Sequence, residues 1–126
     1  MKYVGVDLHK QIIAVCVVVV VSGRRQVERR EKLSCRDVER LKAFFAGLGR
    51  FELAVEATAA YEWLLELVEP VAERIVLVHP RKMRIIAESR RKSDRYDAQV
   101  LAEFLAADEL PEAWRPTPRV REHRAL

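Results

Sequence analysis

Cysteine is scarce in this chain, since Cys16 and Cys35 are the only two among 126 residues. Cys16 lies in an apolar run and Cys35 at the expected start of a helix, so the pair resembles neither a disulfide framework nor a zinc cluster. This usage argues against a disulfide-stapled secreted domain and favours a reduced, cytoplasmic setting.

Long hydrophobic segments are also missing. The valine-rich run IIAVCVVVVV (12–21) has ten residues, whereas a membrane helix needs roughly 20, so we expect a buried strand and no membrane partner. The N-terminal segment is interrupted by Asp7, His9 and Lys10 and has no signal-peptide pattern. There is no internal repeat or low-complexity segment beyond the valine run.

Positive charge is present but unevenly spread. The net charge is +4 and the pI is about 9.3, which is compatible with a nucleic-acid partner without proving one. The cations gather in residues 81–95 and in the tail RPTPRVREHR. Half of the residues are apolar and 33% are charged, the composition of one soluble domain with a modest core.

The order of expected elements indicates a mixed α/β protein. Ser34 is the expected N-cap of the first helix, and this helix is expected to end at the GLG of residues 47–49. Pro80 is expected to begin a basic helix. We expect strands at 2–8, 12–21, 26–33, 51–57 and 74–79, and further helices at 59–69 and 93–106.

Two carboxylates belong to apolar strands, Asp7 inside one and Glu56 at the end of another. Asp7 shares one face of its strand with Tyr3 and Gly5, and Gly5 leaves room for a close approach. A buried carboxylate needs a cation, a hydrogen-bond network or a solvent opening, although a strand-end aspartate facing water is an equal alternative. Glu56 ends LAVE, a position where α/β folds place their sites.

Asp94 and Asp97 lie three apart, which puts both on one face of a helix. Alone, they are explained by charge compensation of the neighbouring Lys92 and Arg95. Together with Asp7 and Glu56 they form a set of oxygen ligands that suits Mg²⁺ or Mn²⁺. Two such ions about 3.5–4 Å apart can cleave a phosphodiester. The cations expected to clamp phosphates are Arg81, Lys82, Arg84, Arg90, Arg91, Lys92 and Arg95.

These acids and their surroundings resemble the N-terminal catalytic domain of the DEDD-type insertion-sequence transposases, which include Piv-like DNA invertases and bridge-RNA-guided recombinases. The resemblance covers nearly the whole chain. It is carried by YVGVDLHK (3–10), AVEATAAYEWL (54–64), VLVHPRKMR (76–84) and RKSDRYDAQVLAEF (91–104).

The resemblance implies a ribonuclease-H-like, RuvC-like domain with a three-strand meander followed by βα units. It also implies a catalytic, metal-binding tetrad of Asp7, Glu56, Asp94 and Asp97, with DNA, a guide RNA and a second copy of the chain as partners. Residues 1–108 would form the catalytic domain and 109–126 a Pro/Arg-rich linker toward a missing C-terminal domain. Ala59, followed by Ala60, stands where the family usually has glycine.

Other residues near these motifs have plainer explanations. We expect His9 to be an exposed turn residue, His79 a solvent-edge residue and Ser93 a helix cap. Tyr61 and Tyr96 flank the acidic motifs and suit either core packing or stacking on a nucleotide.

Three functions compete at this point. The first is a metal-dependent transposase or recombinase domain, and the second is a stand-alone Holliday-junction endonuclease with the same acids. The third is a non-catalytic nucleic-acid-binding module, which needs only the cations. An actin-like ATPase is discounted, because HKQI after Asp7 lacks the glycines of a phosphate loop.

Overall fold

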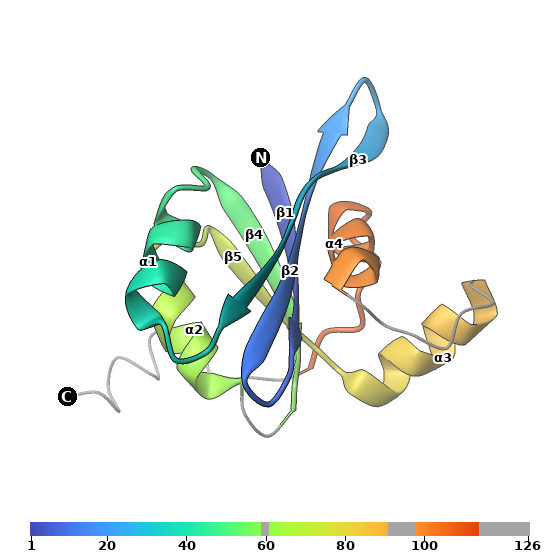
Figure 1. Ribbon diagram of the computed structural model, residues 1–126. Helices are drawn as coiled ribbons and strands as arrows, with labels where there is room; N and C mark the ends of the chain where they lie inside the picture. Colours follow the sequence, from blue (N-terminus) through green and yellow to red (C-terminus); the bar gives the residue numbers. More distant parts are fainter. Residues whose placement is uncertain (59–60, 91–97, 114–126) are drawn as a thin grey trace.

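The computed structural model describes residues 1–58, 61–90 and 98–113 (Figure 1). Within these ranges the expected order of elements is confirmed, and none of the helices is long and apolar enough to cross a membrane. The elements are β1 (Lys2–Leu8), β2 (Ile12–Val21), β3 (Arg24–Ser34), α1 (Val38–Ala46), β4 (Phe51–Glu56), α2 (Glu62–Val68), β5 (Arg74–Val78), α3 (Pro80–Arg90) and α4 (Ala98–Ala106).

The five strands form one mixed sheet in the order β3-β2-β1-β4-β5. β1, β2 and β3 are an antiparallel meander, whereas β4 and β5 join the other edge of β1 as parallel strands. Central β1 therefore has an antiparallel neighbour on one side and a parallel neighbour on the other. This arrangement confirms the α/β class with a ribonuclease-H-like sheet.

Successive side chains of each strand point to opposite faces of the sheet, so the core has two layers. Val4, Val6, Leu53 and Val55 point to the face that α1 and α2 cover, and Phe45 packs among them. The opposite face of the sheet packs against α4 and against Met83 of α3, and beyond this contact α3 extends away from the sheet (Figure 1).

α4 comes very close to β1 at Gly5. A Cβ atom built on Gly5 would lie 2.0 Å from the Ala98 carbonyl oxygen and 2.7 Å from the Ala102 nitrogen. Only a residue without a side chain allows the helix backbone to rest on the strand here. Ala98, at the first turn of α4, is thereby held beside β1.

The predicted N-cap of the first helix, Ser34, is wrong, because the helix is capped three residues later. Asp37 is the N-cap of α1, and its side chain accepts a hydrogen bond from the Arg40 nitrogen at 3.2 Å. Ser34 is still part of β3, because Ile12 pairs with it and extends the ladder. The expected cap Ser93 lies outside the described residues.

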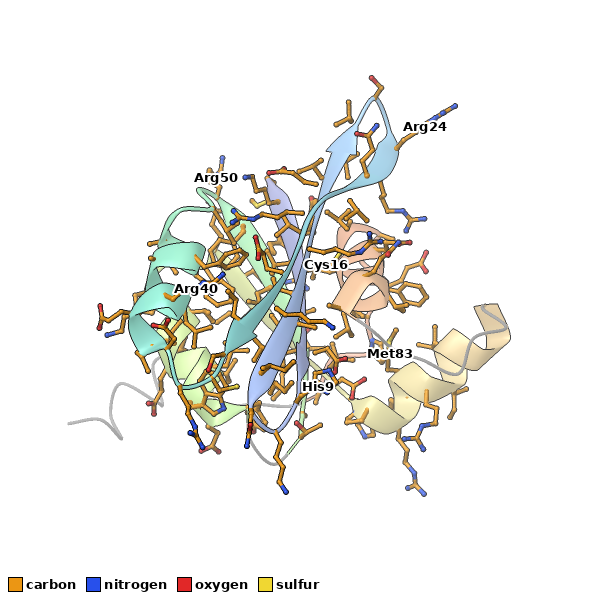
Figure 2. All side chains as sticks on the ribbon, viewed as in Figure 1. His9, Cys16, Arg24, Arg40, Arg50 and Met83 are labelled. Atoms are coloured by element: carbon orange, nitrogen blue, oxygen red, sulfur yellow. The ribbon has the colours of Figure 1, made fainter. Side chains whose placement is uncertain are left out.

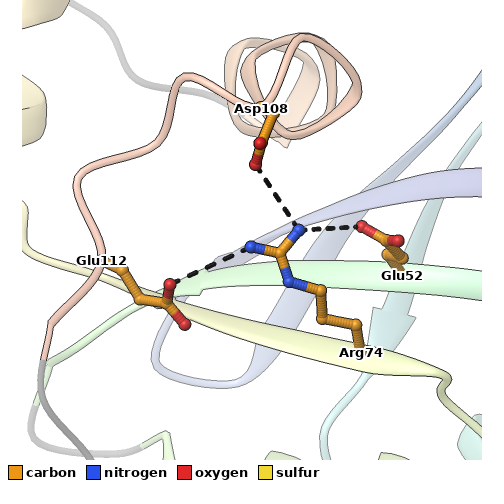
Figure 3. A network of polar contacts seen from close by, with 4 residues as sticks. All are labelled: Glu52, Arg74, Asp108 and Glu112. Carbon is orange, nitrogen blue, oxygen red and sulfur yellow. Dashed lines mark hydrogen bonds and ion pairs between the residues drawn. The ribbon is translucent and has the colours of Figure 1, made fainter.

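The segment after α4 returns to the outer edge of the sheet. Glu112 forms an isolated antiparallel bridge with Val78, and the Ala113 nitrogen donates to the Leu77 oxygen at 2.6 Å. Arg74 joins the parts: its guanidinium lies 3.4 Å from Glu52, 3.6 Å from Asp108 and 4.0 Å from Glu112 (Figure 3). One arginine thus connects β4, β5, the end of α4 and the returning segment.

Candidate active site

Asp7 and Glu56 are brought together by the pairing of β1 with β4. The two strands are parallel, and their register ends with Val6 opposite Val55, one residue before each acid. Neighbouring strands lie about 4.8 Å apart. Since Val6 and Val55 face α1 and α2, the alternation turns Asp7 and Glu56 to the α4 face.

The chain leaves the sheet directly after Glu56. The Ala57 nitrogen donates to the Val78 oxygen and the Thr58 nitrogen to the Glu56 oxygen, both at 2.9 Å. These bonds hold the end of β4 while the side chain of Glu56 stays half-buried. The carboxylate is therefore at the edge of the sheet, between the core and solvent.

The pKa of Glu56 is affected by the neighbouring acid Asp7. Burial raises the pKa of the Glu56 carboxyl, and the negative charge of Asp7 raises this pKa further, while the positive charge of Arg84 opposes both effects. Two carboxylates in such proximity repel when both are ionised. A cation between them would remove the repulsion.

His9 is exposed, as expected, yet it contacts the site. Its Nε2 lies 3.1 Å from Asp7 Oδ2, and 52% of its side chain is exposed. His9 follows Asp7 by two residues and belongs to the turn between β1 and β2. Figure 2 shows it at the end of the sheet from which α3 extends. This contact orients one oxygen of Asp7.

The expected tetrad is described only in part. Asp94 and Asp97 lie outside the described residues, as do Arg91, Lys92, Arg95 and Tyr96. In the described ranges no group of three or more His, Cys, Asp or Glu side chains could hold a metal ion. Asp7 and Glu56 supply two hard oxygen donors, which fit a divalent cation of the Mg²⁺ or Mn²⁺ type in part.

The basic helix is present and begins as expected at Pro80. Arg81, Lys82 and Arg84 are exposed, whereas Met83 is fully buried against the sheet (Figure 2). Arg84 is the member of this helix that reaches the electrostatic range of Glu56. The charged face of α3 thus begins beside the acidic pair and extends away from it.

The role of His79 was not foreseen from the sequence. It is half-buried, so part of it reaches solvent as expected. Its Nδ1 accepts a hydrogen bond from the Lys82 nitrogen at 3.3 Å, and its backbone oxygen accepts one from the Met83 nitrogen at 3.0 Å. It therefore caps α3. The sequence signal for this cap was that His79 directly precedes Pro80, because proline is favoured at the first position of a helix. Tyr61 is half-buried and packs on the core, the plainer of its two expected roles.

Comparison with known proteins agrees with the sequence resemblance. A search of curated proteins gives no match to this chain. Residues 4–126 match the family of DEDD transposases of the IS110 type, which is described as transposase. Transposases of the DEDD type generally depend on divalent metal ions. Because the match spans nearly all of its residues, the chain belongs to the IS110-type family of DEDD transposases.

Proposed function

We propose that this chain carries the metal-dependent active site of a DNA transposase, which cleaves phosphodiesters and transfers strands at insertion-sequence ends. Family membership supports transposase function and DNA binding. The observation that carries the proposal is the meeting of Asp7 and Glu56 on one face at the ends of parallel neighbours, with the pKa of Glu56 raised.

The chemistry requires the two acids to be close and ionised. At neutral pH, repulsion from Asp7 and burial both oppose ionisation of Glu56, and a divalent cation offsets both effects. Bound there, Mg²⁺ or Mn²⁺ would activate an oxygen nucleophile and stabilise the leaving oxygen of a phosphodiester. Asp7 and Glu56 would hold the ion, and the contact with His9 keeps one Asp7 oxygen in place.

Asp94 and Asp97 complete the proposed tetrad. Asp97 is joined directly to Ala98, whose carbonyl oxygen packs on Gly5, two residues before Asp7 on the same face. The close approach of α4 to β1 therefore supports a site shared by the two strand acids and the residues that precede α4.

Nucleic acid would be held by the basic helix next to the acids. Arg81, Lys82 and Arg84 are exposed on α3, and the proposal extends this phosphate clamp to Arg90, Arg91, Lys92 and Arg95. Cations of this kind position the backbone without reading sequence.

The family resemblance supplies the rest of the proposed setting. A guide RNA and a second copy of the chain are proposed partners, and the cytoplasm is the proposed location. Residues 1–108 are proposed as the catalytic domain and 109–126 as the linker. The linker would then begin on the edge of β5, where Glu112 bridges Val78.

Cleavage of labelled branched DNA by the 126-residue chain, with Mn²⁺ or with chelator, tests the proposal. The variants are Asp7→Asn and Glu56→Gln, and the matched control is Glu66→Gln, an exposed acid of α2 on the opposite face. We expect metal-dependent cleavage to fall by about 100-fold or more in the two site variants, as for other groups that act in the transition state, and to persist in the control. Cleavage that survives Asp7→Asn contradicts the proposal, and binding of DNA without any cleavage favours a non-catalytic module.

A further inference from the structure

A basic groove runs between β3 and α4, on the same face of the sheet as Asp7. One part has a volume of about 350 Å³ and includes Ala14, Arg30 and Lys32 in its wall; the next has about 390 Å³ and includes Arg24 and Arg25. Gln99 of α4 borders both parts. The two parts therefore follow one another along β3.

A β-bulge in the β2–β3 ladder places several cationic side chains on the face of the sheet that packs against α4. Val17 pairs with Arg29 and Val18 with Val27, so that Glu28 is an extra residue on β3. Such a bulge reverses the alternation. As a result the side chains of Arg25 and Arg30 both reach α4. Arg25 Nη1 donates a hydrogen bond to the backbone oxygen of Glu103 at 3.2 Å, and Arg30 Nη2 donates one to Gln99 Oε1.

Lys32 lies in the same cross-strand row as Asp7. Asp7 is opposite Ala14, and Ala14 is opposite Lys32. Two strand spacings separate Lys32 from Asp7, or about 10 Å between backbones, and the small side chain of Ala14 leaves the space between them open. The lysine at one end of the groove thus stands beside the candidate active site.

The two end cations are available for a ligand. Lys32 and Arg24 are both exposed, and within the described residues neither side chain makes a hydrogen bond or an ion pair. Figure 2 shows Arg24 at the β2–β3 hairpin. By contrast, Arg25 and Arg30 are held by α4 and supply positive charge from the groove wall.

The acids nearby cancel only part of this charge. Glu31 borders the groove, but its carboxylate lies 3.0 Å from Arg29, and Glu28 lies 2.9 Å from Lys2. Glu103 also borders the groove, and its carboxylate, which accepts a hydrogen bond from Gln99 Nε2 at 2.6 Å, offsets one of the positive charges. Four cations therefore line a groove that ends beside two carboxylates.

We propose that the β3–α4 groove is a second phosphate-binding subsite, in which Lys32 and Arg24 hold the sugar–phosphate backbone of the strand that enters the acidic pair. The segment of β3 from Arg24 to Lys32 extends over about 26 Å, enough for several phosphates. The inference rests on the proposed function in taking nucleic acid as the ligand, and it adds a surface distinct from α3.

Binding of fluorescent 20-nucleotide strands to the 126-residue chain, measured by anisotropy at several salt concentrations, tests the subsite. The variants are Lys32→Gln, Arg24→Gln and their combination. The matched control is Lys42→Gln, an exposed lysine of α1 on the opposite face. Removing one cation that binds a phosphate makes the slope of log K against log salt shallower by about 0.7 for a single strand. We expect this change for each single variant, about twice it for the double variant, and none for the control.

Parallel titrations with DNA, RNA and duplex of one sequence identify the source of the phosphates, and a shallower slope with any of them supports the subsite. The proposal of this subsite is contradicted if the variants have the same salt slope as Lys42→Gln, or if the unaltered chain binds none of the strands. Asp7→Asn separates the two proposals: it should retain the salt slope of the unaltered chain, while cation binding and cleavage report on the acidic pair alone.

Discussion

Glu56 is the residue whose chemistry the fold changes most clearly. Its carboxyl is half-buried and faces the negative charge of Asp7, and both effects raise its pKa. A carboxyl with a raised pKa in the folded state stabilises the fold when it is protonated, and this contribution is lost as pH rises through the folded-state pKa. In the absence of metal, the ionised Glu56 is therefore a cost to stability at neutral pH.

Replacing Glu56 with glutamine should remove this cost. In chelator at pH 7 we expect Glu56→Gln to raise the free energy of unfolding by about 0.5–1 kcal/mol, a small value because the group is partly solvated. The gain should shrink below the unfolded pKa of about 4.3, where the wild-type carboxyl is protonated in both states. Urea unfolding at pH 4 and pH 7 measures both numbers. A variant that is less stable than wild type at pH 7 would contradict the assigned cause.

At the residue scale the sequence marks the two strand acids as candidates for a physical reason, and their role in a site stays a prediction. Asp7 and Glu56 each interrupt an apolar strand, and such a carboxylate signals a site or an opening. Their mutual distance could not be predicted, because it depends on the pairing of β1 with β4 across 49 residues of chain. His79 was missed because its capping bond uses a ring nitrogen that no periodicity reveals.

At the scale of elements, α4 is positioned by its contact with β1. The backbone of Ala98 and Ala102 rests on Gly5, and Cys16 and Val18 of β2 pack against the same helix face. The position of the first turn of α4 relative to Asp7 therefore depends on the absence of a side chain at Gly5.

Gly5→Ala should displace α4. The added Cβ would lie 2.0 Å from a backbone oxygen, which cannot move aside as a flexible side chain does. We expect a loss of at least about 1–3 kcal/mol in the free energy of unfolding, the usual cost of overpacking. The control is Gly47→Ala, where the nearest atom is 3.2 Å away and φ is −80°. Equal urea midpoints for Gly5→Ala and wild type would show that the helix is not held there.

Elements were more predictable than their ends. The first helix was predicted, whereas its first residue depended on how far β3 continued its ladder with β2. The bulge at Glu28 left no signal, since RRQVERREKLS has polar residues at nearly every position and its pattern does not specify which face is buried. The groove along α4 was therefore not foreseen.

At the scale of the whole molecule, the candidate site acids and the cations proposed to bind phosphates lie on one side of the sheet. α1 and α2 cover the other face, whereas α4 packs on this face and α3 extends away beside it (Figure 1). The acidic pair lies at one edge of this face, and the β3–α4 groove lies across from it. The family match and the resemblance of motifs agree on a transposase. The metal, the complete tetrad and the strand path remain proposals that this arrangement supports.

Calorimetric titration of Mg²⁺ and Mn²⁺ into the chain, Asp7→Asn and Glu66→Gln tests the central claim most directly. Branched DNA is present in one series and absent in the other. Because Asp7 is a proposed ligand and Glu66 lies on the opposite face, Asp7→Asn should bind the ion at least about tenfold more weakly, or about 1.4 kcal/mol. The control should match wild type. Equal binding by wild type and Asp7→Asn, or no binding by either in both series, would contradict the account.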